Sequence, residues 1–461
     1  MKHTLFLLFL SLSSLVYAFE STPPDSTLSI LKKAEIKILI SDGRTFYNED
    51  RYRLGLLKFR EALSINKNHA NANYWVAESH LALGNYGTAL KYAKIAESND
   101  PNANKDLQYV IGQSNHRLGN FDAAIKAYEM SLLTMPKSRI KGLLVDKKIS
   151  ECKRGLEMIK TPLDVTIKPL GATVNSRHDD YAAFLSNDGQ QLYYSSRKAQ
   201  NTGGGKSAGD SKYFSDILIS DWDATSKDWT TGKNLDPRIV KLNSQGFDDM
   251  AGFSADGAVL YLTINTEGLL NEKINTQSTD IYYSTLNKEK NWASPKPFDR
   301  SLNTFYFEAS PTFTEDGNTM YFISERIGGE GKADIWTSKK VADVWQKAEN
   351  LGNTINTAQQ ETTVFVSGDN KYLFFSSEGH EGMGGYDIYV SKKVGENWST
   401  PINIGFPIND VSDETHFVFY PKLKKAYYSK LSTDNNGGLG GRDIFEVNLT
   451  TEAIEKIFSS L

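Results

Sequence analysis

Five acidic residues follow an asparagine at one fixed spacing, and they are the strongest candidates for chemistry in this sequence. The pairs have the form Asn-x4-acid and are Asn175 with Asp180, Asn243 with Asp248, Asn303 with Glu308, Asn356 with Glu361, and Asn409 with Glu414. If the repeated units are arranged around an axis, the five carboxylates form a ring near one mouth of a central channel. Such a ring could hold Ca²⁺ or another hard cation, or the basic end of a peptide, because hard cations favour oxygen ligands.

A structural interpretation competes with this one. Each carboxylate could instead accept backbone N–H bonds at a repeated turn. Because the asparagine recurs with the acid, a local turn network explains both residues, and we favour it. No cofactor is therefore predicted, and a bound cation is the alternative.

Motifs for covalent catalysis are weak. Gly205-Lys206-Ser207-Ala208-Gly209 has the form of a serine-hydrolase elbow, but it lies in a Gly/Ser-rich connection rather than between a strand and a helix. The seven histidines show no metal-ligand spacing, and His178, His380 and His416 are expected on loops. Cys152, the single cysteine, is predicted to be a small packing residue. The sequence predicts a protein that is not an enzyme.

Bulk composition is that of a folded protein with two or three domains. The chain has 461 residues, of which 39% are apolar and 23% charged, and its formal net charge is −4. This small net charge gives no electrostatic reason to expect a nucleic-acid partner.

The N-terminus has the pattern of an export signal. Lys2 and His3 precede an apolar run over 5–10, and Val16 and Ala18 occupy the −3 and −1 positions of a cleavage site. Residues 1–18 are thus predicted to be a signal peptide. No later segment approaches membrane length, so we expect release into a periplasm or cell envelope without a membrane span.

A repeat of 34 to 35 residues follows a lead-in segment at 19–35. Gly84-Asn85-Tyr86 recurs as Gly119-Asn120-Phe121, and copies begin near positions 36, 70 and 105. The pattern resembles the tetratricopeptide repeat (TPR) and implies three helical hairpins. A closing helix over 139–159 completes a predicted TPR domain at 36–159. Arrays of this kind imply binding of a peptide segment or another domain.

A second repeat fills residues 160–461. Acidic tight turns such as Asn187-Asp188-Gly189 occur four times, with a degenerate fifth at Pro421-Lys422. A third strand opens with Asp-Ile at Asp216, Asp280, Asp334, Asp387 and Asp443. This predicts a five-bladed β-propeller, and the whole chain an α + β multidomain protein. The last blade has three strands of its own, so residues 163–174, with a strand over 165–170, are expected to complete it and close the ring.

The propeller units resemble the WD40-like repeats of TolB-type propellers. Glu308-Ala309-Ser310-Pro311-Thr312-Phe313 and Gly384-Gly385-Tyr386-Asp387-Ile388-Tyr389 carry the resemblance best. TPR units before such a propeller are similar to envelope proteins of the Bacteroidetes type. Many of those continue into an OmpA-like peptidoglycan-binding domain and attach to gliding or type IX secretion machinery. This sequence ends after the propeller, so no direct peptidoglycan anchor is expected.

These features together predict a scaffold for protein–protein interaction in the envelope, an accessory of an envelope, secretion or gliding complex. Its partners would be envelope proteins or their peptide segments. Two alternatives stay open: a carbohydrate-binding or glycan-cleaving propeller, and a sensor of ions or small ligands that uses the carboxylate ring.

Overall fold

The computed structural model of the chain describes residues 28–202, 204–207, 211–234, 242–265, 279–432, 437–459 and 461. The predicted signal peptide at 1–18 lies outside the described residues, as do positions 19–27 of the lead-in segment. Internal contacts divide the chain into two compact units, residues 1–118 with 126–143, and residues 119–125 with 144–461. No helix in the described ranges is both long and apolar enough to cross a membrane.

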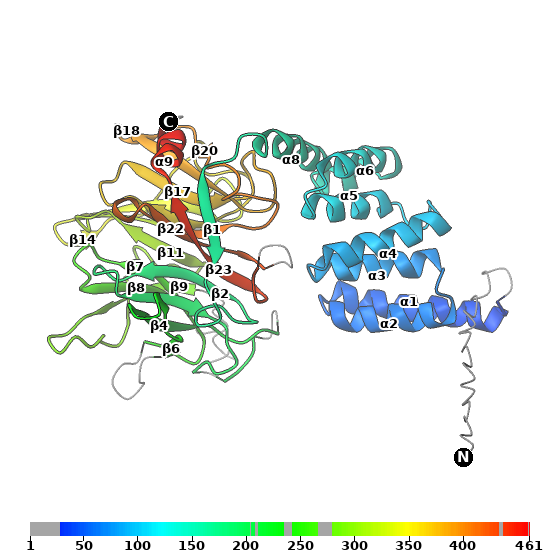
Figure 1. Cartoon of the computed structure of the whole chain (residues 1–461), viewed down its shortest axis with the longest axis horizontal. Helices are drawn as coiled ribbons and strands as arrows, with labels where there is room; N and C mark the ends of the chain where they lie inside the picture. Colours follow the sequence, from blue (N-terminus) through cyan, green and yellow to red (C-terminus); the bar gives the residue numbers. More distant parts are fainter. Residues whose placement is uncertain are drawn as a thin grey trace, which may run out of the picture. The chain divides into compact units, whose positions relative to one another are not determined.

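Helical hairpins form the N-terminal part, as the TPR pattern predicts (Figure 1). The helices are α1 (Ile30–Asn48), α2 (Tyr52–Ile65), α3 (Ala70–Ala82), α4 (Tyr86–Asn99), α5 (Leu107–Arg117), α6 (Phe121–Thr134), α7 (Lys137–Gly142) and α8 (Val145–Met158). The first helix begins at Ile30, inside the predicted lead-in segment.

Glycines set the geometry of these hairpins. Gly84 and Gly119 follow α3 and α5 with φ of +76°, a backbone conformation that only glycine adopts without strain. Within the third hairpin, a Cβ added to Gly112 would lie 2.7 Å from the ring of Tyr128. The missing side chain therefore lets α5 and α6 approach closely.

The predicted closing helix over 139–159 is wrong in one respect, because it is two helices. The chain breaks between α7 and α8 at Leu144, whose φ is +52°. Gly142, a poor helix former, ends α7. Cys152 is fully buried on α8, and burial raises its pKa to about 12, which fits a packing role and not a nucleophile.

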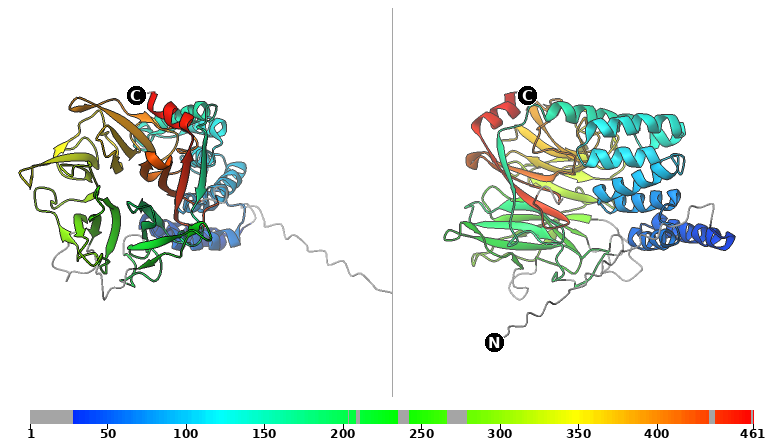
Figure 2. Two further views of the ribbon diagram at one scale, coloured as in Figure 1. Left: turned by 60° about the vertical axis from the view of Figure 1, so that its left-hand side comes forward. Right: turned by 45° about the vertical axis from the view of Figure 1, so that its right-hand side comes forward.

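Five antiparallel sheets follow, arranged around a common axis (Figure 2, left). Blade 1 contains β2 (Asp180–Leu185), β3 (Gln191–Ser196), β4 (Asp216–Asp223), β5 (Asp228–Trp229) and β6 (Lys233–Asn234). Blade 2 contains β7 (Phe247–Phe253), β8 (Val259–Asn265), β9 (Thr279–Thr285) and β10 (Lys296–Pro297). Blade 3 contains β11 (Glu308–Phe313), β12 (Thr319–Ser324), β13 (Asp334–Val341), β14 (Val344–Trp345) and β15 (Glu349–Asn350).

The remaining strands complete the ring. Blade 4 contains β16 (Glu361–Val366), β17 (Tyr372–Ser377), β18 (Asp387–Val394), β19 (Asn397–Trp398) and β20 (Ile402–Asn403). Blade 5 contains β21 (Thr415–Tyr420), β22 (Lys425–Leu431), β23 (Arg442–Leu449) and β1 (Val165–Pro169). In four blades the turn after the innermost strand has positive φ at the predicted position, for example +69° at Gly189 and +56° at Asn370.

The predicted closure of the propeller is confirmed. β1 pairs antiparallel with β23, so that Ile167 lies opposite Val447. The first strand of the propeller is thus the outer strand of its last blade, so both ends of the propeller chain are held in one sheet and the ring is closed.

A C-terminal helix, which the sequence analysis missed, packs on blades 4 and 5. In α9 (Thr451–Ser459), Ala453 and Ile457 are buried, and the ring of Phe458 lies 4.4 Å from that of Tyr372 and 6.3 Å from that of Phe374. The helix thereby covers apolar side chains of two neighbouring blades.

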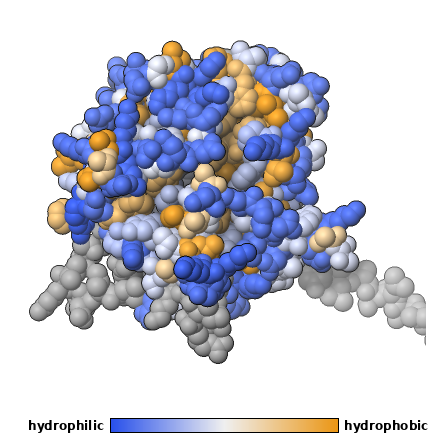
Figure 3. Space-filling view, turned by 90° about the vertical axis from the view of Figure 1, so that its left-hand side faces the viewer, coloured by the Kyte–Doolittle hydropathy of each residue, from blue (hydrophilic) through white to orange (hydrophobic). Residues whose placement is uncertain are grey.

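The surface is polar over most of the face shown in Figure 3, as far as the described residues cover it. Hydrophobic groups form small separate patches there rather than one broad face. Single apolar groups of this kind are normal for a folded surface.

Replacing Ile457 by alanine should lower the free energy of unfolding of the propeller by about 2–4 kcal/mol, since a buried side chain is truncated. Urea unfolding followed by tryptophan fluorescence measures this. Glu455→Ala, on the exposed side of the same helix, is the control and should change stability by less than about 0.5 kcal/mol. Equal effects of the two substitutions would contradict the packing of α9.

Candidate functional site

The five repeated acids lie at the starts of the innermost strands. Asp180, Glu308 and Glu361 are the first residues of β2, β11 and β16, Asp248 is in β7, and Glu414 directly precedes β21. All five side chains are fully buried, so none of them presents a carboxylate to solvent.

Each of these acids accepts a hydrogen bond from the backbone N–H four residues earlier. The N–H and hydroxyl of Ser176 donate to Asp180 at 2.6 and 2.7 Å, and those of Ser244 donate to Asp248 at 2.6 and 2.9 Å. The N–H and hydroxyl of a threonine donate to Glu308 and Glu361 in the same way, and the N–H of Asp410 donates to Glu414. This is the repeated turn network that the structural interpretation describes.

The paired asparagines connect neighbouring blades. The amide of Asn243 accepts from Ile217 N–H at 2.8 Å and donates to Ile217 C=O at 3.0 Å, so it holds both backbone groups of one residue on the third strand of the preceding blade. The other four asparagines repeat this interaction, at Ile281 for Asn303, Ile335 for Asn356, Ile388 for Asn409 and Ile444 for Asn175. In each case the isoleucine is that of the repeated Asp-Ile dipeptide.

Burial of the acids is only partly compensated. Oδ1 of Asp180, Oδ1 of Asp248 and Oε1 of Glu414 are buried without a hydrogen-bond partner. Desolvation raises the pKa of Asp180 to about 6 and that of Glu361 to about 7, against the opposing hydrogen bonds to each carboxylate. Within the described residues, no group of three or more His, Cys, Asp or Glu has a geometry that could hold a metal ion. The cation alternative stays a prediction.

Blade 5 departs from the repeat. Asp410 stands where the other blades have serine or threonine, which places a second acid beside Glu414. Lys430 compensates, since its buried ammonium donates to Asp410 at 2.8 Å. The Asp410 charge raises the pKa of Glu414 further above that set by its burial.

Four of the repeated aspartates of Asp-Ile, those at 216, 334, 387 and 443, also accept from the chain's own backbone. Asp387 accepts from the N–H groups of Met383 and Gly384 at 3.1 and 3.3 Å, and Asp216 accepts from Thr202 N–H at 2.6 Å. The glycine-rich turns therefore wrap a carboxylate of their own blade.

A hollow of about 390 Å³ opens where the innermost strands end. One half-buried aromatic ring from each blade lines it: Phe184, Phe253, Phe313, Phe365 and Tyr420. Its other lining residues include the polar side chains of Asn187, Glu315 and Lys422. This volume is that of a small-ligand pocket.

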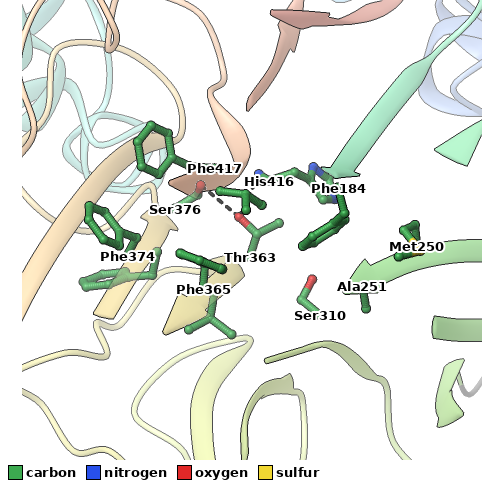
Figure 4. Close-up of a pocket in the computed structure, with 13 residues that line it drawn as sticks. Phe184, Met250, Ala251, Ser310, Thr363, Phe365, Phe374, Ser376, His416 and Phe417 are labelled. Carbon is green, nitrogen blue, oxygen red and sulfur yellow. Dashed lines mark hydrogen bonds between the residues drawn. The ribbon is translucent and has the colours of Figure 1, made fainter. Parts of the chain in front are cut away.

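Figure 4 shows a pocket at the centre of the propeller that is lined by residues of the innermost strands, among them His416. Contacts of Tyr181 break the five-fold repeat here. Tyr181 donates its hydroxyl to Asp249 at 2.6 Å, and the ring of His416 lies 5.3 Å from that of Tyr181. The expectation that His416 lies on a loop is wrong, because it is in β21, where its backbone forms part of a β-bulge with φ of +55°. Burial lowers its pKa to about 3, so it is neutral near pH 7.

The TPR array holds a second cluster, which the sequence analysis missed. Glu78 on α3 accepts hydrogen bonds from the hydroxyls of Tyr47, on α1, at 3.2 Å, and of Tyr74. The guanidinium of Arg44 lies 5.2 Å from the ring centre of Trp75. Arg44, Glu78 and Gln113 occupy one position of the repeat, which is a signal that the sequence did contain.

Loss of a bridging asparagine should destabilise the propeller. Asn356→Ala leaves the buried N–H of Ile335 without its acceptor, while the C=O of Ile335 keeps the N–H of Leu351 at 3.2 Å, and should lower the free energy of unfolding by about 1–3 kcal/mol in urea. Asn318→Ala, on an exposed turn, is the control. A cost below about 0.5 kcal/mol for Asn356→Ala would contradict the bridging role.

Glu361 should make stability depend on pH. Its pKa is raised from 4.5 to about 7 in the folded chain, so the folded state keeps a proton that the unfolded state loses. Its stabilising contribution is complete below pH 4.5 and is lost as the pH rises through about 7. Glu361→Gln, which mimics the protonated acid, should reduce this fall in urea unfolding experiments. Identical pH profiles for both chains would contradict it.

Comparison with known proteins supports the helical repeats. The tetratricopeptide-repeat family model matches residues 42–104 and 77–134. No curated protein sequence matches the chain. Two similar solved structures are the TPR domain of Arabidopsis OM64 (16% identity, 26% of this chain and 96% of that one, TM-score 0.24) and the first TPR domain of RPAP3 with an HSP90 peptide (13%, 27% and 94%, TM-score 0.25).

A third solved structure has a more distant likeness. The α-L-arabinofuranosidase PaAbf62A of Podospora anserina is 11% identical over 64% of this chain and 98% of that one, with a TM-score of 0.38.

From the family match and the strand order together, the chain carries N-terminal TPR helical repeats followed by a five-bladed β-propeller.

Proposed function

We propose that the chain is a non-catalytic scaffold for protein–protein interaction, in which the TPR array binds a segment of a partner protein. The observation that carries the proposal is a contrast between the two repeats. The repeated polar residues of the propeller bond to their own backbone, whereas the TPR helices place tyrosine, tryptophan and charged side chains on one face.

Location in a periplasm or cell envelope is part of this proposal. It is supported by the export pattern of residues 1–18 and by the resemblance of the blade repeats to TolB-type propellers. The partners would then be envelope proteins, and the complex an envelope, secretion or gliding assembly.

The non-catalytic part of the proposal is supported by how the acids are used. Glycan cleavage requires two carboxyl groups that flank the scissile bond. Asp249 is the acid that departs from the five-fold pattern in the innermost strands, and its hydrogen bond goes to Tyr181. A tyrosine partner of this kind does not supply the second carboxyl group.

The full chain with three substitutions on the TPR face tests the proposal. Arg44→Ala, Glu78→Ala and Gln113→Ala together should remove most partner proteins that the unchanged chain captures from an envelope extract, as read by mass spectrometry. The matched control replaces Asn187, Glu315 and Lys422, three polar lining residues of the propeller hollow, by alanine and should retain them.

Capture that survives the TPR substitutions would contradict the proposal, and capture lost only with the control would assign recognition to the propeller. Circular dichroism spectra must match between all chains, so that loss of capture reports on the surface and not on folding.

A further inference from the structure

Two departures of blade 5 from the repeat meet in space. Asp410 takes the place of the serine or threonine that follows the repeated asparagine in the other blades. Lys430 lies opposite the aspartate of Asp-Ile in the pairing of the second and third strands, a position at which blades 1, 3 and 4 have serine. The two changes occur in the same blade, and they bring an amine and a carboxyl group together beside the repeated acid Glu414.

The amine of Lys430 is held against the carboxyl group of Asp410. Its Nζ donates to Oδ2 at 2.8 Å, and Oδ2 is bonded to Cγ, the carbon that an amine attacks when an amide forms. Oδ1 of the same group accepts from the N–H of Ser412 at 2.7 Å, which fixes the orientation of the carboxyl group. Two reacting groups that are held in contact in this way gain the high effective concentration of an intramolecular reaction.

This contact lies in an apolar part of blade 5 from which most water is excluded. The side chain of Lys430 is only 6% exposed and that of Asp410 26%. The rings of Phe445 and Tyr428 are fully buried, and their centres lie 5.1 and 5.7 Å from Nζ. Because two charges are costly in such surroundings, a reaction that converts them into one neutral amide is favoured. Exclusion of water also slows the reverse hydrolysis.

Glu414 is placed to carry the proton that amide formation requires. Its side chain is fully buried, and its Oε2 accepts from the N–H of Asp410 at 3.3 Å. Its Oε1 is buried without a hydrogen-bond partner. Burial and the charge of Asp410 raise the pKa of Glu414, which favours its protonated form. A buried acid beside the reacting pair is suited to general acid–base catalysis.

We propose that Lys430 and Asp410 form an intramolecular isopeptide bond, with Glu414 as the proton carrier. One proton passes from the ammonium to the carboxylate across their hydrogen bond, and the neutral amine then attacks Cγ. The bond between Nζ and Cγ forms, and the bond from Cγ to the protonated oxygen breaks. Glu414 carries a second proton from the nitrogen to this oxygen, which leaves as water. Ammonium and carboxylate thus give one amide and one water, and Glu414 returns to its starting protonation state.

This bond ties the turn that enters blade 5 to the second strand of the same blade. Blade 5 is also the sheet in which β1 pairs with β23, so it holds both ends of the propeller chain. The bond therefore strengthens the blade on which closure of the ring depends. It concerns the covalent structure of the chain alone and is independent of the scaffold function proposed above.

Mass spectrometry of the purified full chain tests the bond after denaturation, which separates ion pairs but leaves amides intact. The mass should be lower by one water molecule than the mass expected from the Lys430→Arg chain after allowance for the substitution. After trypsin digestion, the peptide that contains Asp410 should remain joined to the peptide that contains Lys430. Cleavage after Lys430 should be absent, because trypsin does not cut at an acylated lysine.

Three substitutions and a matched control make the test specific. Lys430→Arg, which keeps the positive charge, and Asp410→Ser, which restores the residue of other blades, should both lack the joined peptide. Glu414→Gln, which has the same shape but carries no acid proton, should lose most of it. Lys425→Arg is the control, since Lys425 lies on the same strand in an ion pair with Glu446 at 3.0 Å, and it should retain the joined peptide in full.

An unchanged chain of full mass, whose two peptides separate after digestion, would overturn the inference. That measurement needs no variant, so it decides the question even if a substitution prevents folding. Undiminished joining in Glu414→Gln would overturn the role of Glu414 as proton carrier. Circular dichroism spectra that match the unchanged chain show that loss of the bond in a variant is chemical.

Discussion

The propeller depends on a side-chain amide that adds to scattered backbone hydrogen bonds between blades. Sheets of a propeller pack face to face, so their backbones meet at isolated points rather than along strand ladders, for example where Asp248 N–H donates to Ser215 C=O at 3.0 Å. The asparagine that enters each blade solves this locally, since one amide satisfies both backbone groups of an isoleucine in the blade before it. The interaction between Asn175 and Ile444 does the same across the seam between the two ends of the propeller chain.

The acid that follows each asparagine fixes the turn in which that amide sits. Its carboxylate binds the N–H four residues earlier, and the innermost strand then starts. The cost is a buried acid at most junctions whose charged form is penalised by desolvation, as the raised pKa values of Asp180, Asp248, Glu361 and Glu414 show. Different blades offset it differently, with Arg326 beside Glu308 and Lys430 beside Asp410. The asparagine is the same in all five units, whereas the acid varies between Asp and Glu and the residue after the asparagine varies between Ser, Thr and Asp.

The sequence predicted those features that depend on local backbone geometry or on the number of repeats. Glycine and asparagine at the tight turns, the five Asn-x4-acid units and the closing strand at 165–170 all follow from backbone geometry or from counting. It failed where the outcome depends on packing between distant segments. Helix α9 packs where Ile457 and Phe458 contact the rings of blades 4 and 5. His416 contacts Tyr181 because blades 5 and 1 are neighbours once the ring is closed. The cluster around Glu78 could have been predicted from the sequence, because Arg44, Glu78 and Gln113 occupy equivalent positions of the repeat.

In the function proposed above, the two repeats divide structure from recognition: the repeated polar groups of the propeller maintain its ring, and the TPR array binds a partner. Hydrogen–deuterium exchange of the full chain, alone and with a captured partner, tests this division most directly. The account predicts that the amides of Ile217, Ile335 and Ile444 exchange slowly in both states, and that partner-induced protection falls on α1, α3 and α5. Fast exchange at these isoleucines, or protection confined to the propeller, would contradict it.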